Sequence, residues 1–468
     1  MTETVNRSDS YNGYYKKKAP THDPELTETG PDTPMGEYMR RFWHPVCLSD
    51  ELTDVPKAIR ILNEDLVAFR DRSGNIGVLH RHCSHRGTSL EFGIIQSKGI
   101  RCCYHGWVWD VDGKLLEVPA EPEDSKIPER VCQGAYPAFE RNGLVFSYLG
   151  PPEEQPAFPE YDAYRQPSDN KLVAFSNIYP CNWLQVYENI MDHVHTALLH
   201  NNMTVESVEQ DIKDGLNFPE AFKDLPVMDW EKTRNGHGCT FIAGRRVDED
   251  TVWVRLTEMV FPDLIQNANL MTSAHQVRHT SVCMTRWHTP VDDKNCILFG
   301  WRHFNKEIDL NGDGCEEDCG YDKIDFVDGQ CERPYAVGQR APGDWDAICS
   351  QRPIAVHALE NPGTSDRGVY LCRQLLRDLV RGKTGLDTTK TMSKDGRETK
   401  HTLCSDSTVH LKRADDREVD RQQIKKIGRE VYGIMVDADA QPSIRRRAFI
   451  LSRLDELDGG PSAREAAE

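Results

Sequence analysis

The sequence has no run of about 20 apolar residues, the length that a helix needs to cross a membrane. Its first 20 residues, MTETVNRSDSYNGYYKKKAP, lack the apolar core of a secretory signal. A cytoplasmic protein is therefore expected. Basic residues are in the minority, since 57 Lys and Arg stand against 75 Asp and Glu and give a net charge of -18. This balance argues against a nucleic-acid partner.

A disulfide framework is also not indicated. The 15 cysteines are odd in number, and most of them stand singly along the chain. In a long cytosolic protein such cysteines are expected to be reduced thiols. The chain of 468 residues is long enough for two or three domains.

The pattern along the chain predicts an α+β protein. Residues 1–37 read as a polar N-terminal arm, and short strands separated by turns predict a small all-β domain over 38–150. After a Pro-rich linker, longer alternating segments over 151–385 predict an antiparallel sheet with one buried face, between helical stretches. An acidic insertion lies at about 304–332, and 386–468 reads as a C-terminal helical extension.

The stretch HRHCSHRGTSLEFGIIQSKGIRCCYHGWVWD (80–110) contains Cys83-x-His85 and, after sixteen residues, Cys102-x-x-His105. Thiolates and imidazoles bind both zinc and iron. A zinc finger usually takes two cysteines from one structural element and two histidines from another. Here each turn supplies one Cys and one His, which favours a two-iron cluster with both thiolates on one iron and both imidazoles on the other.

Neighbouring residues compete for these roles. The spacing to the second histidine selects Cys102, so Cys103 is expected to be a small buried residue. His80 and His82 fall outside the pattern and are expected to be structural.

A second motif lies in NWLQVYENIMDHVHTALLH (182–200), which contains Glu188-x3-Asp192-x2-His195-x4-His200. On one helix the first three side chains share a face. The two histidines would lie about 140° apart on an ideal helix, so they can share a metal only if the helix kinks or ends between them. An amphipathic helix with surface histidines is the alternative.

Together the motifs resemble those of the Rieske non-haem iron oxygenases. C-x-H…C-x-x-H with HRGTSL and YHGW resembles the Rieske [2Fe–2S] motif, and E-x3-D-x2-H-x4-H after NW resembles the motif for mononuclear iron. GPDTPMGEYMRRFWHPV (30–46) resembles the opening of the phthalate dioxygenase and aryl O-demethylase group of α (catalytic) subunits. The resemblance spans about 35–380, so the acidic insertion and the C-terminal tail look like additions.

The resemblance implies a Rieske domain followed by a catalytic domain of the helix-grip, START-like kind, with a [2Fe–2S] cluster and a mononuclear Fe(II). It implies His195 and His200 as iron ligands, and Asp192 as the link to a Rieske histidine across a subunit boundary. Glu188 is expected near this link, either tuning Asp192 or hydrogen-bonding a ligand histidine, although a solvated carboxylate is an equal alternative.

The third iron ligand must come from later in the chain. PGDWDAICSQRPIAVHALENPGTSDRG (342–368) resembles the downstream segment of the family. Counting back from the Pro353–Ile354 pair favours Asp344 as the ligand over Asp346. Either residue is also an ordinary candidate for a helix N-cap.

The implied function is that of a terminal oxygenase component, which oxidises an aromatic, carboxylated compound by O-demethylation, monooxygenation or cis-dihydroxylation. Its implied partners are an NAD(P)H-dependent reductase with flavin and a ferredoxin-type centre, and further copies of itself in a homotrimer or a multiple. The alternatives are a steroid or terpenoid hydroxylase, a non-catalytic Rieske electron carrier and a zinc-stabilised interaction protein. Four strand arginines are candidates for pairing a substrate carboxylate, and the sequence selects none of them: Arg245, Arg246, Arg255 and Arg278.

Overall fold

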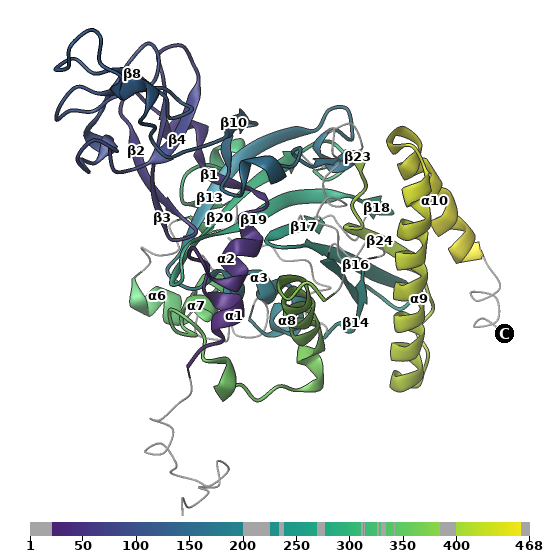
Figure 1. The fold of residues 1–468 in the computed structure, drawn as a ribbon. Helices are drawn as coiled ribbons and strands as arrows, with labels where there is room; N and C mark the ends of the chain where they lie inside the picture. Colours follow the sequence, from purple (N-terminus) through teal and green to yellow (C-terminus); the bar gives the residue numbers. More distant parts are fainter. Residues whose placement is uncertain are drawn as a thin grey trace, which may run out of the picture.

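The structure is a computed structural model, and Figure 1 shows a small β-domain, a large sheet with helices beside it, and two long C-terminal helices. The structure describes residues 21–199, 225–233, 238–268, 277–309, 312, 314–324, 327–328, 334–340, 342–383 and 399–459. No helix within these ranges is both long enough and apolar enough to span a bilayer.

The small β-domain follows two short helices, α1 (Pro24–Thr27) and α2 (Pro34–Met39). Its strands form three sheets with the orders β1-β11-β10, β2-β3-β4-β9 and β5-β6-β7-β8. The strands are β1 (Trp43–Leu48), β2 (Lys57–Ile61), β3 (Glu64–Arg70), β4 (Ile76–His80), β5 (Ile94–Ile95), β6 (Ile100–Arg101), β7 (Val108–Trp109), β8 (Leu115–Glu117), β9 (Ala135–Tyr136), β10 (Ala138–Arg141) and β11 (Leu144–Tyr148). The predicted small all-β domain is confirmed.

The core of this domain lies directly beneath two loops that carry cysteine and histidine. Buried side chains of β3, β4, β6 and β7 pack in one cluster, and Cys83 and Cys102 belong to it. His85 and His105 are only half-buried. Apolar packing therefore anchors the two cysteines, while the two imidazoles lie closer to solvent.

The large region is built on an antiparallel sheet with the order β13-β20-β19-β17-β16-β15-β14. Strand β24 pairs with β16 and with β18, outside that path. The strands are β13 (Lys171–Tyr179), β14 (Val227–Lys232), β15 (Gly238–Arg246), β16 (Thr251–Val260), β17 (Leu264–Ala268), β18 (His279–Thr280), β19 (Val282–Asp292), β20 (Asn295–Phe304) and β24 (Ser405–His410). The predicted antiparallel sheet is confirmed.

Helices lie on both sides of this sheet (Figure 1). They are α3 (Trp183–Glu188), α4 (Val194–Leu198), α6 (Tyr335–Arg340), α7 (Asp344–Cys349), α8 (Arg367–Val380), α9 (Arg417–Asp437) and α10 (Ser443–Gly459). Two further pairs of two-residue strands are β12 (Glu160–Tyr161) with β23 (Thr399–Lys400), and β21 (Lys323–Ile324) with β22 (Val327–Asp328).

Successive residues of β15 show how the sheet is covered, because side chains of a strand alternate between its faces. Phe241 and Ala243 pack in the cluster that includes Leu375 of α8, whereas Ile242 packs with Ile424 of α9. Every residue of β15 is buried. The expectation of a single buried face is therefore wrong for this strand, because α9 removes the second face from water.

The C-terminal segment contributes more than helices to the large region. Besides α9 and α10 it supplies β24, whose six residues pair with Thr251–Leu256 of β16. Arg246 of β15 forms a buried ion pair with Asp420 of α9. The C-terminal segment is thus part of the sheet and of its cover.

Candidate active site

The two loops with cysteine and histidine share one backbone construction. In each, the cysteine amide donates to a carbonyl five residues on, at 2.9 Å for Cys83 and 2.8 Å for Cys102. A glycine amide then donates back to the cysteine carbonyl, at 2.8 Å from Gly87 and 3.1 Å from Gly106. Both glycines have positive φ, at +77° and +75°, a conformation that residues with a Cβ rarely adopt. Each loop therefore presents its Cys and His from the same tight turn.

The four side chains converge. The buried thiols of Cys83 and Cys102 form a hydrogen bond, and burial is the largest cause that raises the pKa of the Cys83 thiol. The rings of His85 and His105 lie 4.5 Å apart at an angle of 71°. The buried His85 Nδ1 has no hydrogen-bond partner in the part of the chain that the structure describes. Two soft sulfurs beside two imidazoles fit a metal cluster with mixed ligands.

Two tryptophans fix these donors. The His85 ring stacks on Trp107 at 4.2 Å, with the ring planes 4° apart. The indole Nε1 of Trp109 donates to Cys83 Sγ at 3.4 Å. Hydrogen bonds to cluster sulfurs are one of the ways in which a protein sets a reduction potential. Neither tryptophan was singled out from the sequence, although both lie within the stretch that carries the motif.

The neighbouring residues are placed differently from one another. Cys103 is exposed, so the expectation that it is buried is wrong: with Cys102 facing the core, the next residue of the turn faces solvent. His80 contacts the hydroxyl of Tyr136 at 3.4 Å, and His82 donates to a carbonyl of its own loop at 3.0 Å. Both histidines agree with the structural role expected for them.

The predicted helix that bears the second motif is broken into α3 and α4, with a 3-10 turn between them (η7, Asn189–Met191). Asp192 comes next in an extended conformation, and its Oδ1 accepts a hydrogen bond from Val194 N at 2.9 Å. The three side chains of the motif therefore do not share one continuous helix face. Helix α4 ends at Leu198, before His200, as a shared metal requires. His200 itself lies outside the described residues.

His195 lies between two carboxylates. Its Nε2 is 3.4 Å from Asp344 Oδ1 and its Nδ1 is 3.8 Å from Asp192 Oδ2. Asp346 has another role, because its Oδ2 accepts a hydrogen bond from Gly343 N at 2.8 Å at the start of α7. The geometry thus places Asp344 beside the histidine and uses Asp346 as a cap. An imidazole nitrogen facing a carboxylate oxygen at this distance fits a shared iron.

Hydrogen bonds join the segment around α3 to the segment around α7, which lies more than 160 positions later in the chain. Asn182 N donates to Pro353 O at 2.8 Å. The buried Gln185 donates to Ile348 O at 3.2 Å and accepts from Ala355 N at 2.7 Å. The backbone that carries Asp344 is therefore fixed against the helix that leads to His195.

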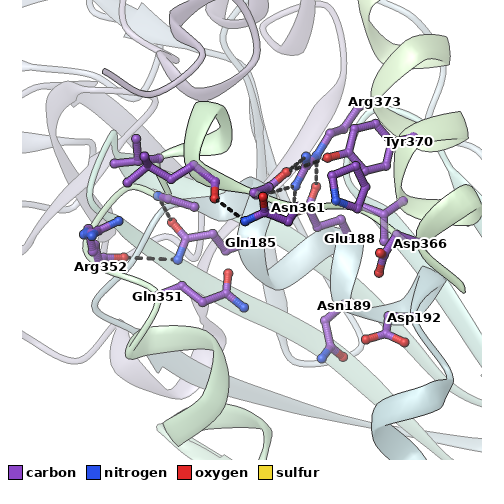
Figure 2. Close-up of a pocket in the computed structure, with 16 residues that line it drawn as sticks. Gln185, Glu188, Asn189, Asp192, Gln351, Arg352, Asn361, Asp366, Tyr370 and Arg373 are labelled. Carbon is purple, nitrogen blue, oxygen red and sulfur yellow. Dashed lines mark hydrogen bonds and ion pairs between the residues drawn. The ribbon is translucent and has the colours of Figure 1, made fainter. Parts of the chain in front are cut away.

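A pocket of about 480 Å³ lies beside α3 and α8 (Figure 2). Asp192 and Glu188 both line it. The hydrogen bonds of Glu188 come from Arg373, whose Nε donates to Oε2 at 2.6 Å and whose Nη2 donates to Oε1. Arg373 also donates to both oxygens of Glu360, at 2.6 and 3.0 Å. Glu188 thus lies near Asp192, as expected, with a guanidinium as its partner.

Metal-binding atoms of Glu188, His357 and Glu360 lie within 4.8 Å of one another, which resembles a metal site. Arg373 already supplies a cation to both carboxylates and would repel a second one. We therefore interpret the cluster as an ion-pair network. The sequence carries no motif that points to His357, Glu360 or Arg373. A buried carboxylate needs a cationic partner, so one can be expected for Glu188. The sequence does not indicate which basic residue it is.

Comparison with known proteins agrees with this geometry. The model of the Rieske [2Fe-2S] domain matches residues 42–137. The oxygenase subunit of tert-butanol monooxygenase / tert-amyl alcohol desaturase from Aquincola tertiaricarbonis is 56% identical over 456 residues, 96% of each chain. Phenoxybenzoate dioxygenase subunit alpha from Ectopseudomonas oleovorans is 34% identical over 402 residues, 81% of this chain and 90% of that one.

A solved structure shows the same fold. NdmA of Pseudomonas putida CBB5 with caffeine has a TM-score of 0.53 at 21% identity, and the match covers 82% of this chain and 99% of that one. The Aquincola protein matches beyond the expected span of 35–380, so most of the C-terminal tail is shared with that relative. Oxygenase subunits of this kind use a Rieske cluster and a mononuclear non-haem iron. The chain belongs to the Rieske non-haem iron oxygenases, as a catalytic oxygenase subunit.

Proposed function

We propose that this chain is the terminal oxygenase of a system that oxidises short branched alcohols of the tert-butanol type. The observation that carries the proposal is the 56% identity to the Aquincola oxygenase subunit over 96% of both chains. Relatives that act on aromatic acids are more distant, at 34% for phenoxybenzoate dioxygenase and 35% for phthalate 4,5-dioxygenase, the latter over 58% of this chain.

Three of the four strand arginines support a substrate without a carboxylate. Three of the four candidates are paired with carboxylates of this chain: Arg246 with Asp420, Arg255 with Asp406, and Arg278 with Asp455 and Asp458. The fourth, Arg245, donates to the hydroxyl of Thr196 at 2.7 Å. Arginines that already hold an internal carboxylate are not available to bind one on a substrate.

The donor sets support an assignment of residues to the two cofactors. The cluster would be held by Cys83, His85, Cys102 and His105, and the iron by His195, His200 and Asp344. When bound, these groups supply single electrons and the activation of O₂. Asp192 faces Nδ1 of His195 and favours the tautomer with its proton there, which leaves the Nε2 lone pair facing Asp344.

The partners are part of the proposal. Oxygenase subunits of this family belong to multicomponent systems. We infer an NAD(P)H-dependent reductase with flavin and a ferredoxin-type centre as the electron donor. We also infer a homotrimer or a multiple of it, in which Asp192 meets a cluster histidine of a neighbouring copy.

The chemistry of the alcohols defines the products. The central carbon of tert-butanol carries no hydrogen, so oxygen can be inserted only at a methyl C–H, which gives a 1,2-diol. The second oxygen atom leaves as water, with two electrons from the reductase and two protons. The ethyl group of tert-amyl alcohol can instead lose two hydrogens from adjacent carbons. That gives an alkene, and both oxygen atoms then leave as water.

A carboxylated aromatic substrate is the second candidate, favoured by the match to phenoxybenzoate dioxygenase over 81% of this chain. Purified protein with a surrogate reductase should be tested on tert-butanol, tert-amyl alcohol, phenoxybenzoate, phthalate, methoxylated benzoates and a terpenoid alcohol. Oxygen uptake and products should be followed together. We expect diol and alkene from the two alcohols. Turnover of the aromatic acids alone would overturn the proposal.

A further inference from the structure

Arg373 of α8 is a buried cation that holds two carboxylates from different parts of the chain. Its side chain is 10% exposed and that of Glu188 is 9% exposed, whereas Glu360 is 32% exposed. The guanidinium is shared, and the hydroxyl of Tyr370 donates to Glu360 at 2.9 Å. Figure 2 shows Arg373 and Glu188 meeting at one end of the pocket. Two carboxylates on one guanidinium leave a net negative charge.

Glu188 connects this ion-pair network to Asp192, because it is close to Asp192 along the chain and both residues line the same pocket. Glu188 is the last residue of α3, and η7 alone separates it from Asp192. Asp192 lines the same pocket, as does Asp366. Without Arg373, the pocket wall would hold Glu188 and Glu360 side by side and uncompensated, near Asp192. Repulsion and the cost of burial would then displace Glu188 or protonate it.

We propose that Arg373 is a positioning residue for the active site, which fixes the end of α3 and so sets the place and the electrostatic environment of Asp192. The inference rests on the proposed function only through the role of Asp192. Arg373 holds the end of α3 from α8, independently of the hydrogen bonds between α3 and residues 348–355.

His357 provides a readout that a purely structural ion pair would not give. It faces Arg373 of α8, Glu188 of α3, Glu360 of its own segment and Asp23 of the N-terminal segment. Burial is the largest cause that lowers its pKa, and Arg373 lowers it further, while the three carboxylates raise it. Replacing Arg373 with Met leaves the carboxylates without their cation, so the pKa of His357 is expected to rise.

The pH dependence of stability should differ in size between the two proteins. In the native chain the pKa of folded His357 lies below its unfolded value, so this group costs stability as the pH falls through that unfolded value. In Arg373→Met the pKa of folded His357 should lie closer to the unfolded value, because burial still lowers it but the neighbouring cation is gone. The variant should therefore lose less stability through His357 than the native protein as the pH falls. Thermal unfolding between about pH 5 and 8 measures the difference and does not depend on the substrate.

Four variants of the full chain separate the roles of charge and geometry. Arg373→Met should lower kcat about tenfold or more with little change in KM, and turnover should recover in part toward about pH 6. Arg373→Lys keeps the positive charge but loses the forked pair of donors. Its kcat should lie between those of Arg373→Met and the native protein. Glu188→Gln with Arg373→Met removes both charges and should regain most of the lost turnover. Arg381→Met is the matched control, because Arg381 pairs with Glu25 from the end of the same helix.

The outcomes are decisive in both directions. A loss of turnover in Arg373→Met, with a smaller loss of unfolding temperature toward low pH than in the native protein and rescue by the double variant, supports the proposal. Equal effects of Arg373→Met and Arg381→Met, or a double variant as slow as Arg373→Met, overturn it. If Arg373→Met does not fold, the Lys and double variants carry the same comparison. Failure of the proposed function would be visible separately, as native protein that oxidises no alcohol.

Discussion

The two loops proposed for the cluster and the segments proposed for the iron depend on different lengths of the chain. All four proposed cluster donors fall between Cys83 and His105, in two loops with the same hydrogen-bond pattern. His195 and Asp344 are far apart in the sequence and come within 3.4 Å where α3 is hydrogen-bonded to α7 and to the segment after it. A site made from adjacent turns depends on its own loops, whereas a site made from distant segments depends on the whole sheet between them.

The largest effect should come from the proposed iron ligands, which lie far apart in the sequence. Asp344→Asn should lower turnover by about a hundredfold or more, because the amide cannot replace a carboxylate on the iron. The visible absorption and the EPR signal of the reduced cluster should remain, since the small domain is untouched.

Asp346→Asn is the control for this change. It should lose only part of a cap, about 1 kcal/mol of stability, and keep most of its turnover. If instead Asp346→Asn were inactive and Asp344→Asn active, the assignment of the third ligand would be reversed.

The local site predicts a contrast between two adjacent cysteines. Cys102→Ser should lose the cluster and its visible absorption, because Cys102 is buried against Cys83. Cys103→Ser should keep the cluster, because Cys103 faces solvent. Iron and sulfide analysis of both purified variants measures this. Equal cluster contents in the two variants would contradict the assignment.

Long-range assembly of the large region can be tested away from any ligand, at Glu258. Its carboxylate accepts a hydrogen bond from Leu403 N of the C-terminal segment at 2.8 Å, and burial raises its pKa to about 7. The unfolded chain ionises above about 4.5, so stability is lost as the pH rises from there to about 7. Glu258→Gln should remove this loss and be more stable than the native protein at about pH 8, by up to about 3 kcal/mol.

Denaturation at about pH 5 and about pH 8 measures this difference. The gain of the Gln variant should be small at the lower pH and large at the higher one. A variant that is equally destabilised at both values would show that Glu258 is ionised in the fold.

The smallest effect concerns the local site. Trp109→Phe removes the hydrogen bond to Cys83 Sγ, which favours the reduced cluster. A hydrogen bond of about 1 kcal/mol corresponds to about 40 mV in a one-electron couple, so the midpoint potential should fall by about that amount. A redox titration followed by absorption measures it, and an unchanged potential would show that this contact does not act on the cluster.

The difference between a site built from adjacent turns and a site built from distant segments also explains what can be predicted from the sequence. Spacing predicts the proposed cluster donors, because each turn is built from a few consecutive residues. The sequence favours Asp344 over Asp346 as the iron ligand but does not settle the choice, since it depends on where α7 begins and on which carboxylate caps it. No pattern in the sequence predicts Arg373, because nothing local links it to Glu188, 185 positions earlier.

Two errors about burial have the same origin. The alternation in β15 was correctly interpreted as a strand, but the cover on its second face comes from α9, far later in the chain. Cys103 was expected inside because cysteines are commonly buried, while the actual direction depends on the register of a tight turn. The pattern of polar and apolar residues indicates whether a segment is a helix or a strand. Which of its faces is buried depends on the segments from elsewhere in the chain that pack against it.

The late position of β24 has a consequence for synthesis of the protein. Strand β16 ends at Val260, but its partner β24 begins only at Ser405, so the central sheet stays incomplete until most of the chain has been translated. The small domain needs no residue beyond Tyr148 for its three sheets. A growing chain therefore has every strand of its small domain well before it has the enclosure in which oxygen is to be handled.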